Sequence, residues 1–162
     1  MDEYLFQLAS SRDAAAIASL SRRLIEAGLP PAWPADRVLC HIKRTDSVVL
    51  TAHVQGPSPD PLAGFAIMQF GEDSAHLNLL AVASVHQRRG LGRKLMTWLH
   101  ESALVAGTFV LGLELRAGNA GAQCFYASLG YQPCGVIRGY YRGIEDAVRM
   151  TCDLRVGRGL TA

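Results

Sequence analysis

The sequence of 162 residues has little of several features that would place it in a special structural class. Its formal net charge is only +2, which argues against nucleic acid as the main partner. It contains no apolar run close to the roughly 18 residues of a membrane-spanning helix. The amino end is acidic and lacks the basic-then-apolar order of a signal peptide. We therefore expect a cytoplasmic protein with neither a nucleic-acid nor a membrane partner.

Cysteines and histidines are few and scattered. The cysteines form no C-x-x-C pair, so we expect free and mostly buried thiols in a reducing compartment rather than a disulfide framework. The histidines show no H-E-x-x-H or other ligand spacing, which predicts that no metal is bound. The four cysteines are Cys40, Cys124, Cys134 and Cys152.

The chain also lacks internal repeats and a long linker. Its densest Pro/Gly stretch, residues 56–61, is typical of a turn and is too short to separate two domains. A chain of this length is able to bury a substantial core as one domain. We expect a single domain over residues 1–154 and a loose tail over residues 155–162.

Hydrophobic periodicity predicts a mixture of helices and strands. Apolar residues at three- and four-residue intervals predict an amphipathic helix over residues 13–27, and a short second helix is expected after Pro34. The order is helices first, then an antiparallel meander, then alternating strands and helices, which predicts an α/β fold with helices on both faces. Strands are predicted over residues 47–54, 62–70, 76–82, 109–115, 131–138 and 147–154, and further helices over residues 90–106 and 120–129.

The most informative stretch lies between a strand that ends at Val82 and the long helix that follows it. At a helix start several backbone N–H groups lack partners and the macrodipole presents partial positive charge, so an anion is favoured there. Glycines at positions 90 and 92 remove β-carbons that would keep a diphosphate away from these amides. The residues of this candidate anion site are Gln87, Arg88, Arg89, Gly90, Leu91, Gly92, Arg93 and Lys94.

Four of these residues are basic, which complements phosphate. The stretch is not a Walker P-loop, because G-x-x-x-x-G-K-[ST] is absent, and it is not a G-x-G-x-x-G dinucleotide fingerprint. From the residues alone, two other interpretations stay open: a basic helix start on a solvated surface, and a nucleic-acid patch.

With these residues in view, the chain resembles the GCN5-related N-acetyltransferases, the GNAT family. In that family a Q/R-x-x-G-x-G/A loop holds the diphosphate of coenzyme A, and residues 87–92 (QRRGLG) match it. Residues 113–131 (LELRAGNAGAQCFYASLGY) are similar to the family's strand, Asn-containing turn and helix. Residues 139–154 (GYYRGIEDAVRMTCDL) resemble the closing segment of the protein N-terminal branch, notably the ribosomal-protein alanine acetyltransferases.

This resemblance implies a single GNAT-like domain with a mixed, mostly antiparallel sheet that splays between its fourth and fifth strands. It also implies acetyl-coenzyme A as co-substrate, held by residues 87–94, by Asn119 and by the fourth strand at Leu80, Ala81 and Val82. The amide-rich pantetheine arm would satisfy backbone groups that the splay leaves unpaired. No metal is expected, and we expect a monomer or a homodimer.

Aminolysis of a thioester needs a neutral amine and a proton for the departing thiolate. The sequence supports no Cys–His or Ser–His pairing, so direct attack without an acyl-enzyme is expected. Glu114 is the candidate general base, as the matching glutamate is in the resembled branch. Because it lies in an apolar strand, burial is expected to raise its pKa toward neutrality. The alternative is a structural pair with Arg116 or Arg149.

Tyr126 is the candidate general acid and a further coenzyme contact. Phe125 and Leu129, four residues apart, are expected to share the buried face of the helix, which would leave Tyr126 pointing toward the cleft. A tyrosine packed against the core is the alternative. Asn119 is expected to cap the following helix, whether or not it also touches the coenzyme.

The acceptor side rests on three aromatic residues. Tyr140 and Tyr141, expected in the loop before the last strand, match tyrosines that contact the acceptor in the resembled branch. Trp33 is a candidate wall of the acceptor site, and His76 is a secondary base, although all four residues also have a packing interpretation. A protein α-amine, with a pKa of about 8, needs little help to lose a proton, so a protein N-terminus is the preferred acceptor.

Three alternatives remain beside this interpretation. A small amine or a lysine is the alternative acceptor. A non-catalytic acyl-coenzyme A sensor would keep the fold without turnover. A basic nucleic-acid module would reveal itself by steeply salt-dependent duplex binding.

Overall fold

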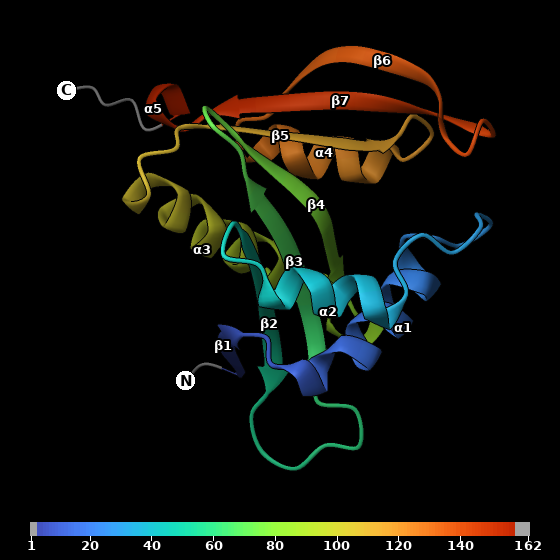
Figure 1. Cartoon of the computed structure of the whole chain (residues 1–162), viewed down its shortest axis with the longest axis vertical. Helices are drawn as coiled ribbons and strands as arrows, with labels where there is room; N and C mark the ends of the chain where they lie inside the picture. Colours follow the sequence, from blue (N-terminus) through green and yellow to red (C-terminus); the bar gives the residue numbers. More distant parts are fainter. Residues whose placement is uncertain (1–2, 158–162) are drawn as a thin grey trace. The chain divides into compact units, whose positions relative to one another are not determined.

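The computed structural model describes residues 3–157, and Figure 1 shows the path of the chain. Within these residues seven strands form one sheet in the order β1-β2-β3-β4-β5-β7-β6. The chain forms two compact units. The first contains the chain up to Gln69 together with Asn78–Leu99, and the second contains Phe70–Leu77 together with the chain after Leu99. Strand β4 and helix α3 each contribute to both units.

The first unit combines an antiparallel meander with three helices. Strand β1 pairs antiparallel with β2, and β2 pairs antiparallel with β3. Its elements are β1 (Tyr4–Leu8), α1 (Ala14–Leu24), α2 (Ala35–Lys43), β2 (Ser47–Val54), β3 (Leu62–Phe70), the later part of β4 (Ala75–Val82) and the start of α3 (Leu91–Val105).

The side chains of β3 alternate between two buried faces. On one face, Phe65 belongs to the same core cluster as Ile17 of α1 and Val38 of α2. On the other face, a Cβ added at Gly64 would come 3.3 Å from Leu95 Cδ1 of α3. Helices α1 and α2 therefore cover one face of the strand and α3 covers the other. Because β3 is buried on both faces, its sequence is a nearly continuous apolar run.

The second unit contains β5 (Val110–Arg116), α4 (Ala120–Ser128), β6 (Gln132–Tyr141), β7 (Glu145–Asp153) and the short α5 (Leu154–Gly157). Strand β5 pairs antiparallel with β7, and β7 pairs antiparallel with β6. The register between the parallel strands β4 and β5 joins Ala75–Leu77 to Leu111–Leu113. Both strands continue past this ladder.

Strands β5 and β7 separate an apolar face from a polar one. Leu113 and Met150 are register partners, and both are buried. The neighbouring partners, Glu114 and Arg149, lie on the opposite face, because successive side chains in a strand alternate. This second face carries the polar cluster described below.

The α/β class and the mixed sheet are confirmed, and the order from α1 to β7 is as predicted, but a strand and not a helix comes first. The predicted strands at residues 47–54 and 62–70 coincide with β2 and β3. Strand β1 was not predicted. Residues 155–157, expected as part of a loose tail, belong to α5, and residues 158–162 lie outside the described residues.

The expectation of mostly buried thiols is wrong. All four cysteines are free, but only Cys152 is buried, and the other three are exposed. Cys134 lies in β6, which is largely exposed, and Cys124 lies on the exposed side of α4.

In the part of the chain that the structure describes, no helix is both long enough and apolar enough to cross a membrane.

Candidate active site

The turn before α3 has an unusual backbone. After β4, a 3-10 turn over Ser84–His86 leads to Arg88 and Gly90, which have φ angles of 66° and 78°. Left-handed φ is natural for glycine and costs an arginine on the order of 1 kcal/mol. Helix α3 begins at Leu91, and the Lys94 N–H donates to the Gly90 carbonyl at 3.1 Å. The N–H groups that precede Lys94 therefore lie at the open end of the helix.

This turn has room for an anion. Residues 87–90 are exposed, and no heavy atom lies within 4 Å of a Cβ added at Gly90. Arg93 and Lys94 are exposed in the first turn of the helix, so cationic side chains flank the backbone donors. Leu91 is buried in the core, which leaves its backbone as the part available to a ligand. Open space, backbone donors and positive charge fit the diphosphate of coenzyme A.

Strand β1 anchors the turn, a role that the sequence pattern did not indicate. The Tyr4 hydroxyl lies 2.9 Å from His86 Nδ1, and the two rings meet edge to face at 5.4 Å. Arg89 forms an exposed ion pair with Glu3 at 3.5 Å. The apolar and aromatic residues of YLFQL were the available signal for a strand. The turn is therefore held from β1 as well as from the helix.

Several predicted coenzyme contacts have structural partners of their own. The Gln87 side-chain amide donates to the Val82 carbonyl at 2.9 Å and so closes the turn upon the end of β4. Asn119 Oδ1 accepts from the Ala122 N–H at 3.0 Å, which confirms the predicted cap of α4. Leu80 and Ala81 lie in β4, as expected. Their contacts with the coenzyme stay predictions.

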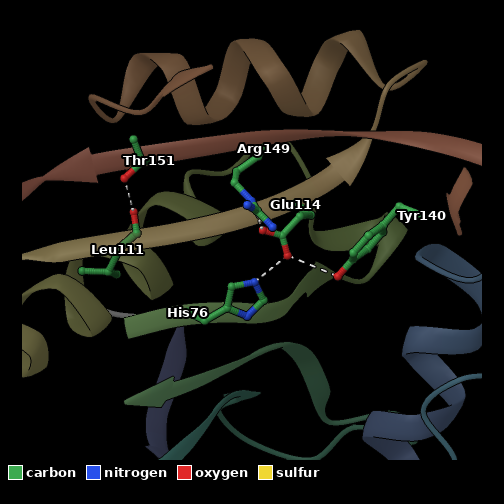
Figure 2. A network of polar contacts seen from close by, with 6 residues as sticks. All are labelled: His76, Leu111, Glu114, Tyr140, Arg149 and Thr151. Atoms are coloured by element: carbon green, nitrogen blue, oxygen red, sulfur yellow. Dashed lines mark hydrogen bonds and ion pairs between the residues drawn. The ribbon is translucent and has the colours of Figure 1, made fainter. Parts of the chain in front are cut away.

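In the second unit, Glu114 is the centre of a polar network (Figure 2). Its Oε1 lies 2.7 Å from His76 Nε2 of β4 and accepts from the Tyr140 hydroxyl of β6 at 3.2 Å. Its Oε2 accepts from Arg149 Nε of β7 at 3.1 Å. Register places these groups together, because Glu114 is the partner of Arg149 and Gly112 is the partner of His76. The Glu114 side chain is only 9% exposed.

The electrostatics of Glu114 are opposite to the expectation. The hydrogen bond from His76 is the largest cause that lowers the Glu114 pKa to about 2, and Arg149 and Tyr140 act in the same direction. Burial acts against them but does not prevail. The predicted rise in pKa is therefore wrong, because the site that buries the carboxylate also supplies three donors to its charged form. The alternative pairing of Glu114 with Arg149 is present.

A groove of about 410 Å³ opens beside this network. It runs along the polar face of the strands, where Gly112 contributes no side chain above the sheet. Arg149 is 53% exposed there, and His76 is 43% exposed. The groove is lined by Ser74, Ala75, His76, Val110, Gly112, Glu114, Cys134, Arg149, Met150 and Thr151. A carboxylate, a guanidinium and an imidazole thus face a cavity with room for part of a peptide.

Tyr126 is more deeply buried than predicted. It is the buried residue of α4, whereas Phe125 and Leu129 are only half-buried. Its ring meets that of Tyr131 edge to face at 5.6 Å, and burial raises its pKa well above the usual value of a phenol. Helical spacing alone assigned the wrong buried face, because two large tyrosines pack against each other here. The hydroxyl therefore stays protonated at neutral pH.

Tyr140 and Tyr141 lie at the end of β6, not in a loop before the last strand. The strand runs further than predicted because the β6–β7 hairpin closes late, with Tyr141 paired to Glu145. Tyr140 is 45% exposed and donates to Glu114, while burial is the main cause that raises the pKa of Tyr141. Tyr140 is thus joined to the predicted catalytic carboxylate, a link that the sequence did not indicate.

Trp33 is held by packing in the first unit. The guanidinium carbon of Arg37 lies 3.8 Å from the centre of its ring, and the His41 ring lies at 5.1 Å. Its backbone N–H donates to the carboxylate of Glu26, a buried residue that also accepts from Ser21. The packing interpretation is therefore confirmed, and the role of Trp33 as an acceptor wall stays a prediction.

Within residues 3–157, no three metal-ligating side chains gather closely enough to hold an ion.

The chain is similar in sequence to known acetyltransferases. Residues 46–133 match the model of the acetyltransferase (GNAT) domain. The [ribosomal protein bS18]-alanine N-acetyltransferase of Salmonella typhimurium is 44% identical over 98 residues, which cover 59% of this chain and 66% of that protein. The naa20 catalytic subunit of the N-terminal acetyltransferase B complex of Schizosaccharomyces pombe is 30% identical over 76% of this chain and 63% of its own length. The matches therefore span slightly less than two thirds of these relatives.

A solved structure extends the likeness over nearly the whole chain. The crystal structure of the ribosomal-protein-S18-alanine N-acetyltransferase from Escherichia coli superimposes with a TM-score of 0.77 at 28% identity. The superposition covers 93% of this chain and 94% of that one. The chain belongs to the acetyltransferase (GNAT) domain family.

Proposed function

We propose that this protein transfers the acetyl group of acetyl-coenzyme A directly to the α-amine of a protein N-terminus. The observation that carries the proposal is the buried carboxylate of Glu114, kept anionic on the wall of an open groove. A carboxylate anion at such a place is suited to hold an ammonium or an amine by accepting its hydrogen bonds. The relatives are named as alanine N-acetyltransferases of a ribosomal protein and as the catalytic subunit of an N-terminal acetyltransferase complex, which supports the same choice of acceptor.

The turn over residues 87–94 binds the donor in this proposal. Its backbone N–H groups and cationic side chains hold the diphosphate, and the anchor from Tyr4 to His86 keeps the turn in place before binding. Asn119 and the end of β4 provide the further contacts that the family resemblance predicts. The bound co-substrate supplies the thioester, and the residues of this chain position it and exclude water.

Glu114 positions the amine but is a weak base by itself. A carboxylate with a pKa of about 2 does not take a proton permanently from an amine whose own pKa is about 8. His76 contacts the same carboxylate at 2.7 Å, and histidine is the side chain that ordinarily changes its charge between pH 5 and 8. We assign proton uptake to the hydrogen-bonded pair of Glu114 and His76, with the carboxylate holding the amine.

Tyr126 donates a hydrogen bond to the departing thiolate in this proposal. Because burial raises its pKa, the hydroxyl remains a hydrogen-bond donor throughout the neutral range. It stabilises the developing negative charge on sulfur by donating a hydrogen bond, and complete proton transfer is uphill for a thiol whose pKa is about 8.5. Tyr140 and Tyr141 contact the first residues of the acceptor in this proposal.

Release of the coenzyme A thiol in the presence of a panel of acceptors tests the proposal. The panel contains peptides with a free N-terminal alanine, the same peptides with a blocked N-terminus and an internal lysine, and small alkyl amines. We expect turnover with the free peptides, and little with the blocked ones. Efficient acetylation of blocked peptides or small amines would move the acceptor to the alternative class. Tight acetyl-coenzyme A binding without thiol release from any acceptor would support a sensor instead.

A further inference from the structure

Arg149 offers more hydrogen-bond donors than its known partner uses. Its Nε donates to Glu114 Oε2 at 3.1 Å. Within residues 3–157, this is the one hydrogen bond of its guanidinium, although a guanidinium carries five N–H donors. The side chain is 53% exposed and lines the groove. The bond through Nε holds the group beside Glu114, and the donors on Nη1 and Nη2 remain for a ligand in the groove.

The groove around these donors favours an anion. Its one carboxylate, Glu114, already accepts hydrogen bonds from three side chains. The other polar lining residues are neutral, apart from His76, which adds positive charge when it is protonated. Thr151 donates its hydroxyl to the Leu111 carbonyl and offers no competing negative charge (Figure 2). An incoming group therefore meets guanidinium donors in a place where the negative charge is already compensated.

The planar edge of a guanidinium matches a carboxylate, which it binds through two parallel N–H···O bonds. The bond to Glu114 already restrains the side chain, so less side-chain entropy is lost when an anion binds. A lysine at the same position would present a point charge without this geometry.

We propose that Arg149 determines acceptor specificity by pairing with an acidic side chain at the second residue of the acceptor polypeptide. This inference rests on the proposed function, in which Glu114 holds the N-terminal amine. Arg149 touches the same carboxylate, so its Nη atoms lie within one guanidinium group of the amine site. Consecutive Cα atoms are about 3.8 Å apart, a spacing that brings the side chain of the second residue within reach.

The test compares two matched peptides in several forms of the full chain. One peptide begins Ala-Asp and the other Ala-Asn, which has the same shape without the charge. For the unmodified protein we expect kcat/KM to be about tenfold higher with Ala-Asp, a typical worth of one partly exposed charged pair. In Arg149→Leu this ratio is expected to fall to about one, and in Arg149→Lys to an intermediate value.

A matched control separates the local effect from loss of charge. Arg155→Leu removes an exposed arginine that is likewise paired with a carboxylate, Asp153, at 2.9 Å. It changes the net charge as Arg149→Leu does, and it leaves the groove unaltered, so the Asp-to-Asn ratio is expected to stay as in the unmodified protein. The analysis by peptide and variant forms a double-mutant cycle, which isolates the interaction between Arg149 and the acidic residue.

The outcomes distinguish this inference from the proposed function. Equal rates for the two peptides in the unmodified protein would overturn the inference and leave the function intact. An equal loss for both peptides in Arg149→Leu would also overturn it, because Arg149 would then act only through Glu114. If neither peptide is acetylated, the Kd of each peptide is measured by calorimetry in the presence of coenzyme A, and these values test the inference. Tighter binding of Ala-Asp that disappears in Arg149→Leu supports the inference, and equal Kd values overturn it.

Discussion

The turn before α3 and the cluster around Glu114 are constructed in opposite ways. The turn depends on what is missing: Gly90 has no side chain, and no heavy atom lies within 4 Å of the place where its Cβ would be. The cluster depends on what is present, because His76, Tyr140 and Arg149 all donate to one carboxylate. Backbone donors that await a partner are suited to hold an anion, whereas a carboxylate that side chains hold in place, with acceptor capacity left, is suited to orient an amine. Substitutions in the two regions are therefore expected to affect different steps.

The largest expected effect is that of Glu114→Gln on turnover. The amide keeps the size of the side chain but loses the charge that holds the amine and pairs with His76. We expect kcat to fall by about 100-fold or more, while the acetyl-coenzyme A Kd stays within about twofold. Steady-state kinetics and calorimetry measure the two quantities. Glu101→Gln, at an exposed site on α3, is the control. An equal loss of affinity for acetyl-coenzyme A would show that the two regions do not act on separate steps.

The same substitution is expected to change stability at acidic pH. The Glu114 pKa is lowered to about 2 in the folded protein, so its ionised form stabilises the fold above its unfolded pKa of roughly 4.3. That contribution is lost as pH falls from about 4.5 toward 2, and it amounts to roughly 2 kcal/mol. Urea denaturation at pH 6, 4.5 and 3 should therefore show the unmodified protein and Glu114→Gln converging at low pH. A constant difference would mean that the carboxylate is not held anionic by its neighbours.

The turn was predictable because everything that makes it is local in the sequence. Two glycines and four basic residues within eight positions indicated a helix start open to phosphate, and the structure places Gly90 at a φ of 78° before the helix. Strand register was harder to predict, since Glu114, His76 and Arg149 are tens of residues apart. The sequence indicated Glu114 but not its donors, and so the direction of its pKa shift was wrong.

Two other errors have the same physical cause. Tyr126 was assigned to the open side of α4 from helical spacing, yet tertiary packing against Tyr131 buries it. Strand β1 was missed because five residues with two exposed leucines carry a weak pattern, although pairing with β2 makes it a strand. Long-range pairing overrides local pattern in both cases.

Gly92→Glu is expected to act on donor binding alone. A carboxylate in the first turn of α3 would occupy the anion site and repel a diphosphate. We expect the acetyl-coenzyme A Kd to rise about tenfold, equivalent to about 1.4 kcal/mol, with kcat at saturating donor kept. Val105→Glu places the same charge at the other end of this helix, on a residue that is 90% exposed, and should leave the Kd unchanged. An unaltered Kd in Gly92→Glu would remove the turn as the diphosphate site.

The smallest effect compares one glycine from each region. At Gly90, with a φ of 78°, an alanine meets no neighbouring atom, so its cost is purely conformational, at about 1 kcal/mol of unfolding free energy. At Gly121, inside α4, an added Cβ would lie 3.9 Å from Asn119 Oδ1, an ordinary contact, and alanine is the better helix former. Gly121→Ala should therefore raise the free energy of unfolding by roughly 0.5–1 kcal/mol, while Gly90→Ala lowers it. Denaturant titrations of both variants measure these opposite signs. If Gly90→Ala were neutral, the positive φ would not be a fixed feature of the turn, and the backbone donors at the start of α3 would have to become ordered when the diphosphate binds.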